Sequence, residues 1–332
     1  MPHQNDHRAL WRPDLEWENG PFKVMMRRET LTDPARADRP VKTKLYYPTS
    51  HDQPTLPVIF WSHGLGGSVD GAGFLSRFLA THGFIVLHLQ HHGTDSSLWE
   101  GKKGHPWDII RATPIPRQAT LDRYRDVPFV LDQLSRLLGQ YPETASADLN
   151  NLGMSGHSFG ALTTQVMAGM TFPDDRGRLL SFKQMAFKAG ILYSPGSLDH
   201  LGAFDPAAVY PGIDIPLMHM TGTDDRSPMS NAGYEDRLIA YNHTDRADKY
   251  LVVLQDGDHM VFNGSRGKLG RNPNRKKHER LIQIMALAFW EAQLKNSQHA
   301  KNWLHNRVQE FLMDQAEYKF KMSGGRYDVS EQ

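Results

Sequence analysis

Residues 152–161 read LGMSGHSFGA, a short apolar run that leads into the pentapeptide Gly156-His157-Ser158-Phe159-Gly160. A serine hydroxyl becomes a useful nucleophile only when a base takes its proton, so the side chain must stand clear of the backbone. A tight turn from a strand into a helix achieves this, and it brings the flanking backbone so close together that glycine is needed on both sides. The pattern also arises by chance, but here it follows a strand-like run and precedes a helix-like one, ALTTQVMAGM. We therefore interpret Ser158 as a nucleophile.

The chain after Ser158 supplies candidates for a base and an acid. Serine hydrolases built on such a turn order their triad as serine, acid and histidine, each at the carboxyl end of a strand. The apolar run PLMHM is followed by Asp224 and Asp225, and the run YLVVL is followed by His259. One histidine among 17 means little by itself, but the ordered set predicts His259 as the base that takes the serine proton.

Either aspartate is a candidate to fix the tautomer of His259 and to stabilise its charged form. We prefer Asp225 because it lies three residues after Gly222, where strand-end acids of such folds commonly lie. Asp224 remains the alternative. An aspartate that is solvated or caps a loop would look the same in the sequence, so the geometry of the strand end has to decide.

The tetrahedral intermediate of such a reaction needs donors for its oxyanion, typically two backbone N–H groups. One is expected from Phe159, the residue directly after the nucleophile. The other is expected from the glycine-rich loop SHGLGGS (62–68), in which Leu65 is our choice. A phosphate-binding loop fits less well, because the pattern G-x-x-x-x-G-K-[ST] is absent and no basic residue lies nearby.

Short apolar runs recur along the chain, separated by helix-like segments. Apolar runs without alternation are typical of strands that are covered on both faces, as in a parallel sheet between layers of helices. The parallel strands are expected at 57–61, 84–89, 149–154, 189–193, 216–220 and 250–254. The segments 22–32 and 39–48 resemble an antiparallel pair at the N-terminal edge. We therefore predict an α/β fold with a mostly parallel central sheet and helices on both faces.

Apolar residues at one-face spacing predict a helix over 126–138, with Asp126 as its cap and Pro128 in its first turn. Further helices are expected around 278–294 and within 298–312. The chain shows no internal repeat, no low-complexity linker and no break in composition. The predicted organisation is a polar N-terminal extension (1–20), one domain with a lid-like insertion (21–316, insertion 93–116) and a C-terminal tail (317–332).

The composition is that of an ordinary globular protein, with 39% hydrophobic and 23% charged residues in a chain of 332. A formal net charge of +1 gives no reason to expect a nucleic-acid partner. The absence of cysteine excludes disulfides, thiolate catalysis and cysteine-based metal sites. The amino terminus has no apolar signal core and no stretch is long enough to span a bilayer, so we expect a cytoplasmic protein without an integral membrane segment. The oligomeric state stays open.

The insertion 93–116 leaves a strand at the edge where such folds build lids and pockets. Trp99 and Trp107 within it are candidates to line an apolar substrate pocket, although packing onto the core is an equally good interpretation. Three histidines at the start of this region, His88, His91 and His92, suggest a metal site. No H-E-x-x-H pattern accompanies them, so neither a metal nor another cofactor is expected.

The stretch FWSHGLGGSVDGAGFLSRFLATHGFIVLHLQHHG (60–93), together with GHSFGA, resembles the α/β-hydrolase superfamily, specifically the branch of dienelactone-hydrolase-like proteins and platelet-activating-factor acetylhydrolases. The segments RDVPFVLDQL, MTGTDDRSPM and GDHMVF resemble bacterial members of that branch. The resemblance covers roughly residues 40 to 295. It implies a serine esterase without metal or organic cofactor, with the triad Ser158, Asp225 and His259 and the amides of Leu65 and Phe159 as the oxyanion hole.

Two departures from that branch bear on the expected reaction and on the expected position of the catalytic acid. Dienelactone hydrolases use a cysteine nucleophile, which this chain lacks. Mammalian-type platelet-activating-factor acetylhydrolases take their acid from just after the strand that follows the nucleophile, where this chain has only Asp199, several residues late. The sequence thus predicts a carboxylic-ester hydrolase that acts through an acyl-enzyme on small to medium acyl esters. The alternatives with the same catalytic groups are a phospholipid acetyl-ester hydrolase, a polyester hydrolase, a thioesterase and an amidase, and a further alternative is a non-catalytic, ligand-binding relative.

Overall fold

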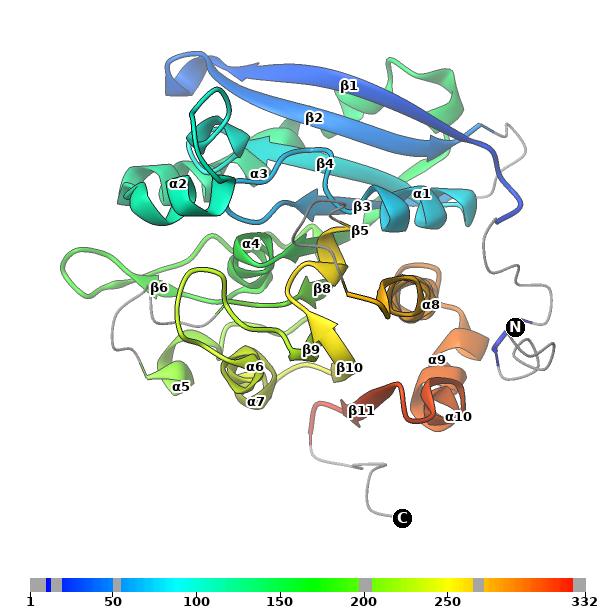
Figure 1. Cartoon of the computed structure of the whole chain (residues 1–332). Coiled ribbons are helices and arrows are strands. Elements are labelled where there is room, and N and C mark those ends of the chain that lie inside the picture. The colour runs from blue at the N-terminus through cyan, green and yellow to red at the C-terminus, as the bar shows by residue number, and fades with distance from the viewer. Residues whose placement is uncertain (1–9, 13–19, 50–54, 197–204, 265–271, 325–332) are drawn as a thin grey trace.

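The computed structural model describes residues 10–12, 20–49, 55–196, 205–264 and 272–324 (Figure 1). These residues form an α/β fold on a nine-stranded sheet with the order β1-β2-β4-β3-β5-β8-β9-β10-β11. The strands are β1 (Val24–Asp33), β2 (Arg39–Pro48), β3 (Leu56–Ser62), β4 (Ile85–His91), β5 (Ala147–His157), β8 (Phe187–Tyr193), β9 (Leu217–Asp224), β10 (Lys249–Asp258) and β11 (Ala316–Lys321). A separate small hairpin consists of β6 (Phe172–Pro173) and β7 (Leu179–Leu180).

The six strands from β4 to β10 in the sheet order run parallel to their neighbours. Antiparallel pairs close the sheet at both edges, β1 with β2 and β2 with β4 at one edge, and β10 with β11 at the other. The predicted α/β fold with a mostly parallel sheet is confirmed. The six predicted parallel strands and the two N-terminal edge strands are present, with ends that differ by a few residues.

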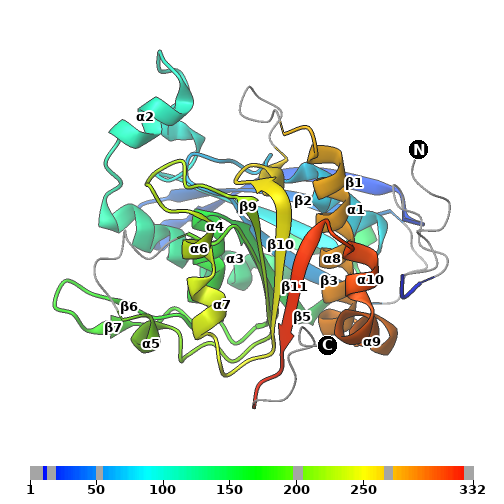
Figure 2. The same cartoon turned by 60° about the horizontal axis from the view of Figure 1, so that its bottom comes forward.

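Helices cover both faces of the sheet (Figures 1 and 2). They are α1 (Gly73–Thr81), α2 (Pro106–Ala112), α3 (Arg117–Leu138), α4 (Phe159–Ala168), α5 (Pro206–Val209), α6 (Tyr234–Arg237), α7 (Ile239–His243), α8 (Arg275–Leu294), α9 (Gln298–Asn306) and α10 (Val308–Leu312). The side chains of β3 point alternately to the two faces of the sheet. Ile59 and Trp61 pack with α1 and α8 on one face, whereas Val58 and Phe60 pack with α3 on the other. A strand covered on both sides is apolar on both sides, which explains the uninterrupted apolar run.

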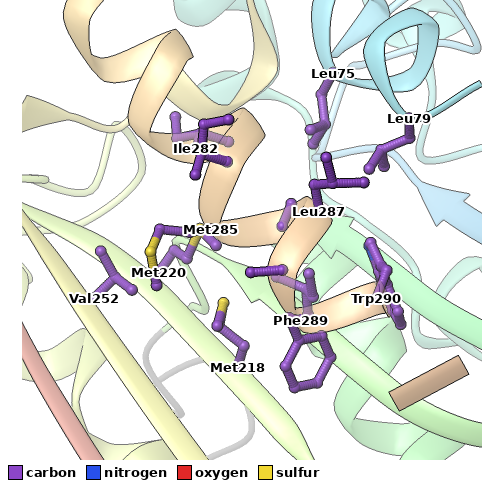
Figure 3. Close-up of a cluster of buried hydrophobic side chains, with 14 of the residues drawn as sticks. Leu75, Leu79, Met218, Met220, Val252, Ile282, Met285, Leu287, Phe289 and Trp290 are labelled. Carbon is purple, nitrogen blue, oxygen red and sulfur yellow. The ribbon is translucent and has the colours of Figure 1, made fainter. Parts of the chain in front are cut away.

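The core on one face is built around α8 (Figure 3). Ile282, Met285 and Phe289 of this helix are buried with Met218 of β9 and Val252 of β10. Each fully buried aliphatic or aromatic side chain contributes about 1.5–3 kcal/mol relative to an exposed one. The helix predicted at 278–294 is confirmed as α8, and it packs against β9 and β10, the strands that precede Asp225 and His259.

The start of the helix predicted at 126–138 needs correction, because α3 begins at Arg117. Asp126 does not cap the helix but lies within it, completely buried, and accepts hydrogen bonds from Arg39. Pro128 also lies inside the helix. The first nine residues, RQATLDRYR, have apolar side chains only at Ala119, Leu121 and Tyr124, too few for an apolar-face pattern to reveal this part of the helix.

Both predicted ends of the domain also need correction. Residues 316–321 form the edge strand β11, so the sheet extends beyond the boundary placed at 316. In the N-terminal extension, residues 10–12 are described: Leu10 is buried in the core, and the indole of Trp11 donates to Glu291 over 2.7 Å. The rest of the extension up to 19, and Asp199, lie outside the described residues. Among the residues described, no helix is long and apolar enough to cross a bilayer.

Candidate active site

Ser158 lies in the turn between β5 and α4 with φ 56° and ψ −115°. This is a strained backbone conformation for a residue with a side chain, and such strain is typical of functional sites. The turn is also too tight for side chains at its flanks. An added Cβ on Gly156 would lie 2.3 Å from the carbonyl oxygen of Gly160, and one on Gly160 would lie 1.9 Å from that of Ser62. The two glycines are therefore required by the close approach of three backbone segments.

His259 follows β10 and forms a pair with Asp225, which follows β9. Its Nδ1 lies 2.8 Å from Oδ1 of Asp225. The second carboxylate oxygen of Asp225 accepts a hydrogen bond from Thr221 over 2.8 Å, and the side chain is completely buried. Asp224, the alternative acid, is exposed at the end of β9. A hydrogen bond from Nδ1 to Asp225 leaves Nε2 of His259 free to accept a proton.

Asp225 remains a carboxylate at any ordinary pH. Burial by itself would raise the pKa of Asp225, but the charge and hydrogen bond of His259 and the charge of Arg237 outweigh it and hold the pKa at about 2. Arg237 of α6 is itself buried, with Nε 3.4 Å from Oδ1 of Asp225 and Nη1 donating to the carbonyl of Pro195 over 3.1 Å. The carboxylate is thus available to orient His259 throughout the neutral range.

Ser194, directly after β8, completes the surroundings of the pair. Its hydroxyl donates to Oδ1 of Asp225 over 2.9 Å, and its Oγ lies 2.7 Å from Nδ1 of His259. On the other side, Nε2 of His157 lies 2.7 Å from the carbonyl oxygen of His259, and the two rings are 4.7 Å apart. Burial, followed by the charge of His259, lowers the pKa of His157 to about 3, so the neutral ring donates to that carbonyl. These contacts fix both the ring and the main chain of His259.

The loop after β3 passes directly over Ser158. An added Cβ on Gly64 would lie 3.4 Å from Cβ of Ser158. Within the described residues, the N–H groups of Leu65 and Phe159 donate no backbone hydrogen bond. Phe159 begins α4, so its N–H is one of the unsatisfied donors that every helix has at its start. Two backbone donors near one serine are the arrangement that stabilises a developing oxyanion.

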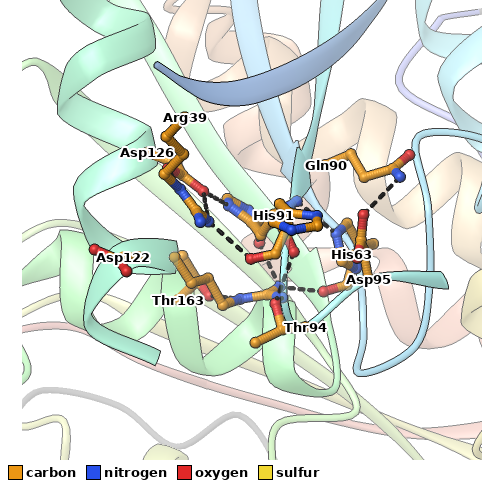
Figure 4. A network of polar contacts seen from close by, with 12 residues as sticks. Arg39, His63, Gln90, His91, Thr94, Asp95, Asp122, Asp126 and Thr163 are labelled. Atoms are coloured by element: carbon orange, nitrogen blue, oxygen red, sulfur yellow. Dashed lines mark hydrogen bonds and ion pairs between the residues drawn. The ribbon is translucent and has the colours of Figure 1, made fainter. Parts of the chain in front are cut away.

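A polar network fixes the start of this loop (Figure 4). Nε2 of His63 accepts from the backbone N–H of His91 over 3.0 Å, and its Nδ1 lies 2.7 Å from the carbonyl oxygen of Gly64. The His91 ring contacts Ser62 and Asp126. Burial lowers the pKa of His91 to about 4 and that of His63 well below its usual value, so both rings are neutral. The backbone before Leu65 is therefore held by fully buried hydrogen bonds.

A hollow of about 470 Å³ opens beside these groups and is lined by Ser158, His259 and Leu65. Trp99 and Trp107, from the insertion after β4, also line it. The indole of Trp99 donates to the carbonyl of Gly66 over 2.7 Å and so attaches the insertion to the loop. The remaining apolar lining comes from Pro106, Ile110, Pro228, Met229 and Met260. A cavity of this volume accommodates a small to medium organic group.

A second hollow of about 310 Å³ adjoins the first, because His259, Met260 and Trp107 line both. Ser158 and Leu65 line only the first hollow. The second is also lined by charged side chains, those of Arg111, Asp224, Arg226 and Asp258. The hollow beside Ser158 thus has mostly apolar side chains, with Glu100 and His105 among them, and the hollow beyond His259 has four charged ones.

Sequence reasoning missed Ser194, Arg237, Thr221 and His157. A serine after a strand and an arginine in the long excursion after β9 carry no motif. The contacts of Arg237, Ser194 and His157 with His259 join residues 22, 65 and 102 positions apart, whereas Thr221 lies four residues before Asp225. Among the suspected metal-binding histidines, His88 lies 2.6 Å from the hydroxyl of Ser76 inside the core. Among the described residues, histidine, aspartate and glutamate side chains form no group of three that could hold a metal ion.

Comparison with models of known protein families gave no match, and a search of curated proteins found no significantly similar sequence. The assignment of a function rests on the geometry of the site.

Proposed function

We propose that this protein is a serine carboxylic-ester hydrolase of the α/β-hydrolase type, with Ser158 as nucleophile, His259 as general base and Asp225 as the residue that orients the base. The observation that carries the proposal is the strained turn that presents Ser158 to the same hollow as a buried, hydrogen-bonded pair of histidine and aspartate. A strained nucleophile, an oriented base and two free backbone donors are the parts that acyl transfer requires.

The reaction would begin with attack of the Ser158 hydroxyl oxygen on the ester carbonyl carbon, while Nε2 of His259 takes the hydroxyl proton. The resulting oxyanion accepts hydrogen bonds from the amides of Leu65 and Phe159. Collapse breaks the bond to the alcohol oxygen, which receives the proton from His259. Water then repeats the sequence on the acyl-enzyme, with His259 as base, and releases the carboxylic acid and free serine.

The two hollows indicate how a substrate would lie. The acyl group is attached to Ser158 and next to the amide donors, so it belongs in the apolar hollow lined by Trp99 and Trp107. The alcohol takes its proton from His259 and leaves on the side of that ring, where the second hollow carries charged side chains. We therefore propose apolar acyl groups of small to medium size. A phospholipid acetyl-ester hydrolase and a polyester hydrolase use the same groups and differ in the alcohol or polymer that binds.

A series of p-nitrophenyl esters from acetate to palmitate tests this proposal. We expect turnover by the wild type, a sharp fall in kcat/KM once the acyl chain exceeds the apolar hollow, and loss of turnover in Ser158→Ala. A Ser230→Ala variant, which changes an exposed serine after β9, is the matched control and should retain the wild-type rates. A wild type that hydrolyses none of the esters, or a Ser158→Ala variant that is equally active, would favour a non-catalytic, ligand-binding relative.

A further inference from the structure

Arg123 of α3 is completely buried beneath the candidate active site and donates hydrogen bonds to three segments of the chain. Its Nε donates to the hydroxyl of Thr163 over 2.7 Å, and its Nη1 donates to that of Thr94 over 3.0 Å. Its Nη2 donates to the hydroxyl of Ser62 over 2.8 Å and also to the carbonyl oxygen of His63. Thr94, Thr163 and His63 are labelled in the polar network of Figure 4.

The guanidinium group also lies against the ring of Phe159, with its central carbon 4.5 Å from the ring centroid. A cation over an aromatic face at this distance is attracted to the ring. Thr163 in turn donates to the carbonyl oxygen of Phe159 over 3.0 Å. Arg123 therefore holds Phe159 directly through the ring and indirectly through Thr163.

These contacts join the two segments that supply the backbone donors near Ser158. His63 lies two residues before Leu65, and Phe159 supplies the second donor itself. The strands before these two segments are paired in the sheet, with Ser62 opposite Gly156, but the two amides lie beyond this pairing, on the loop after β3 and at the start of α4. A planar group with donors in fixed directions is suited to set the distance between two such segments.

Stability alone does not account for this side chain. Burial lowers the pKa of Arg123 to about 9, which still leaves it charged at neutral pH. Its hydrogen-bond acceptors are hydroxyl and carbonyl oxygens, and among the described residues no carboxylate forms an ion pair with it. Removing a charge from water is costly, and hydrogen bonds to neutral acceptors offset only part of that cost. We therefore explain the buried Arg123 by the geometry of the site that it holds in place, and not by a gain in the stability of the core.

We propose that Arg123 is a positioning residue that sets the separation and orientation of the Leu65 and Phe159 amides, and thereby the oxyanion hole. The proposal rests on the function proposed above. It predicts that Arg123 acts on the tetrahedral transition state and not on binding of the substrate, because the amides strengthen their hydrogen bonds only as the oxyanion develops.

The experiment compares Arg123→Met, which removes the charge, and Arg123→Lys, which keeps a charge but loses the planar group. Loss of a whole oxyanion donor costs on the order of 10²–10³ in kcat. Misplaced donors should cost less, so we expect kcat to fall by about 10- to 100-fold in both variants while KM changes by less than about threefold. Val130→Ala removes core contacts of the same helix away from the site and serves as the matched control for a purely structural effect.

A second readout separates positioning from loss of stability. An alkylboronic acid forms a tetrahedral adduct with the serine and mimics the transition state, so its inhibition constant should rise in parallel with the loss of kcat/KM. The carboxylic acid product, which forms no adduct, should bind equally well to all variants. Thr163→Val, which removes the acceptor of Nε and the link to Phe159, should show the same pattern with a smaller amplitude.

Folded Arg123 variants with wild-type kcat, or with reduced kcat and unchanged affinity for the boronic acid, would overturn the proposal. If neither Arg123 variant folds, Thr163→Val decides on the same two criteria. These outcomes are distinct from failure of the proposed function, which would appear as a wild type without turnover that depends on Ser158.

Discussion

Acid should unfold this protein at an unusually high pH, because its core contains several buried neutral histidines. Burial lowers the pKa of His88, His157 and His219 to about 3 and that of His91 to about 4, and it also lowers the pKa of His63 well below its usual value. Burial is the largest cause in every case. In the unfolded chain these side chains return to a pKa of about 6.5.

The sign and size of the effect follow from proton linkage. Between pH 6.5 and about 4 the unfolded state binds more protons than the folded state, so the free energy of unfolding decreases as the pH falls. The contribution of these histidines is fully present above pH 6.5 and is lost progressively below it. At pH 5 each histidine with a folded pKa near 3 or 4 removes about 2 kcal/mol, and four remove about 8 kcal/mol. Domains are typically stable by roughly 5–15 kcal/mol, so a loss of this size removes a large part of the free energy of unfolding by pH 5.

Urea unfolding followed by circular dichroism at pH 7.5, 6.5, 5.5 and 5.0 measures this loss. The variant His219→Leu provides an internal test, because His219 lies in β9 away from the candidate site and its ring nitrogens have no protein hydrogen-bond partner. Its ring packs against Tyr241, with centroids 5.5 Å apart. The variant should be at least as stable as the wild type at pH 7.5 and should lose about 2 kcal/mol less on going to pH 5. A free energy of unfolding that stays constant within about 1 kcal/mol from pH 7.5 to 5 would refute the reasoning.

Three further substitutions test separate parts of the site. Asp225→Asn should lower kcat by about 10³- to 10⁴-fold in the ester assay, because the buried amide no longer selects the tautomer of His259. Asp224→Asn, at an exposed position, should change kcat by less than about threefold, and the reverse order of the two effects would make Asp224 the acid. Gly160→Ala should destabilise the fold by about 3 kcal/mol or more in urea unfolding, since its Cβ would lie 1.9 Å from the carbonyl oxygen of Ser62, and a variant of wild-type stability would contradict the tightness of the turn. Trp107→Ala should raise KM for hydrophobic acyl esters by about 5- to 30-fold, with a smaller effect on the acetate; equal effects on both would remove Trp107 from the acyl pocket.

The parallel strands could be predicted from the sequence, because a buried parallel strand has a simple sequence pattern, a short apolar run between helices. The turn at Ser158 was accessible for a similar reason, since its glycines are required by local backbone contacts. The strand β11 was missed although Ala316, Tyr318 and Phe320 alternate with charged residues. That alternation is the pattern of an edge strand covered on one face, and it is weaker than an uninterrupted apolar run.

The surroundings of the site could not be predicted, because they depend on contacts between distant segments. The choice between Asp224 and Asp225 follows from the end of β9, where Asp224 points to solvent and Asp225 turns inward toward Thr221 and His259. Ser194 lies 65 residues from His259 in the sequence, and its role follows only from the adjacency of β8 and β9 in the sheet. No periodicity or local motif records such a contact.

The most direct test of the central claim is covalent labelling of the folded protein with a fluorophosphonate, followed by intact-mass measurement and peptide mapping. Such a reagent reacts with a serine only where a base activates the hydroxyl. The geometry predicts one adduct per chain, located on Ser158, slower labelling in His259→Ala and no adduct in Ser158→Ala. A folded wild type without an adduct, or an adduct that persists in Ser158→Ala, would contradict the assignment of Ser158 as an activated nucleophile.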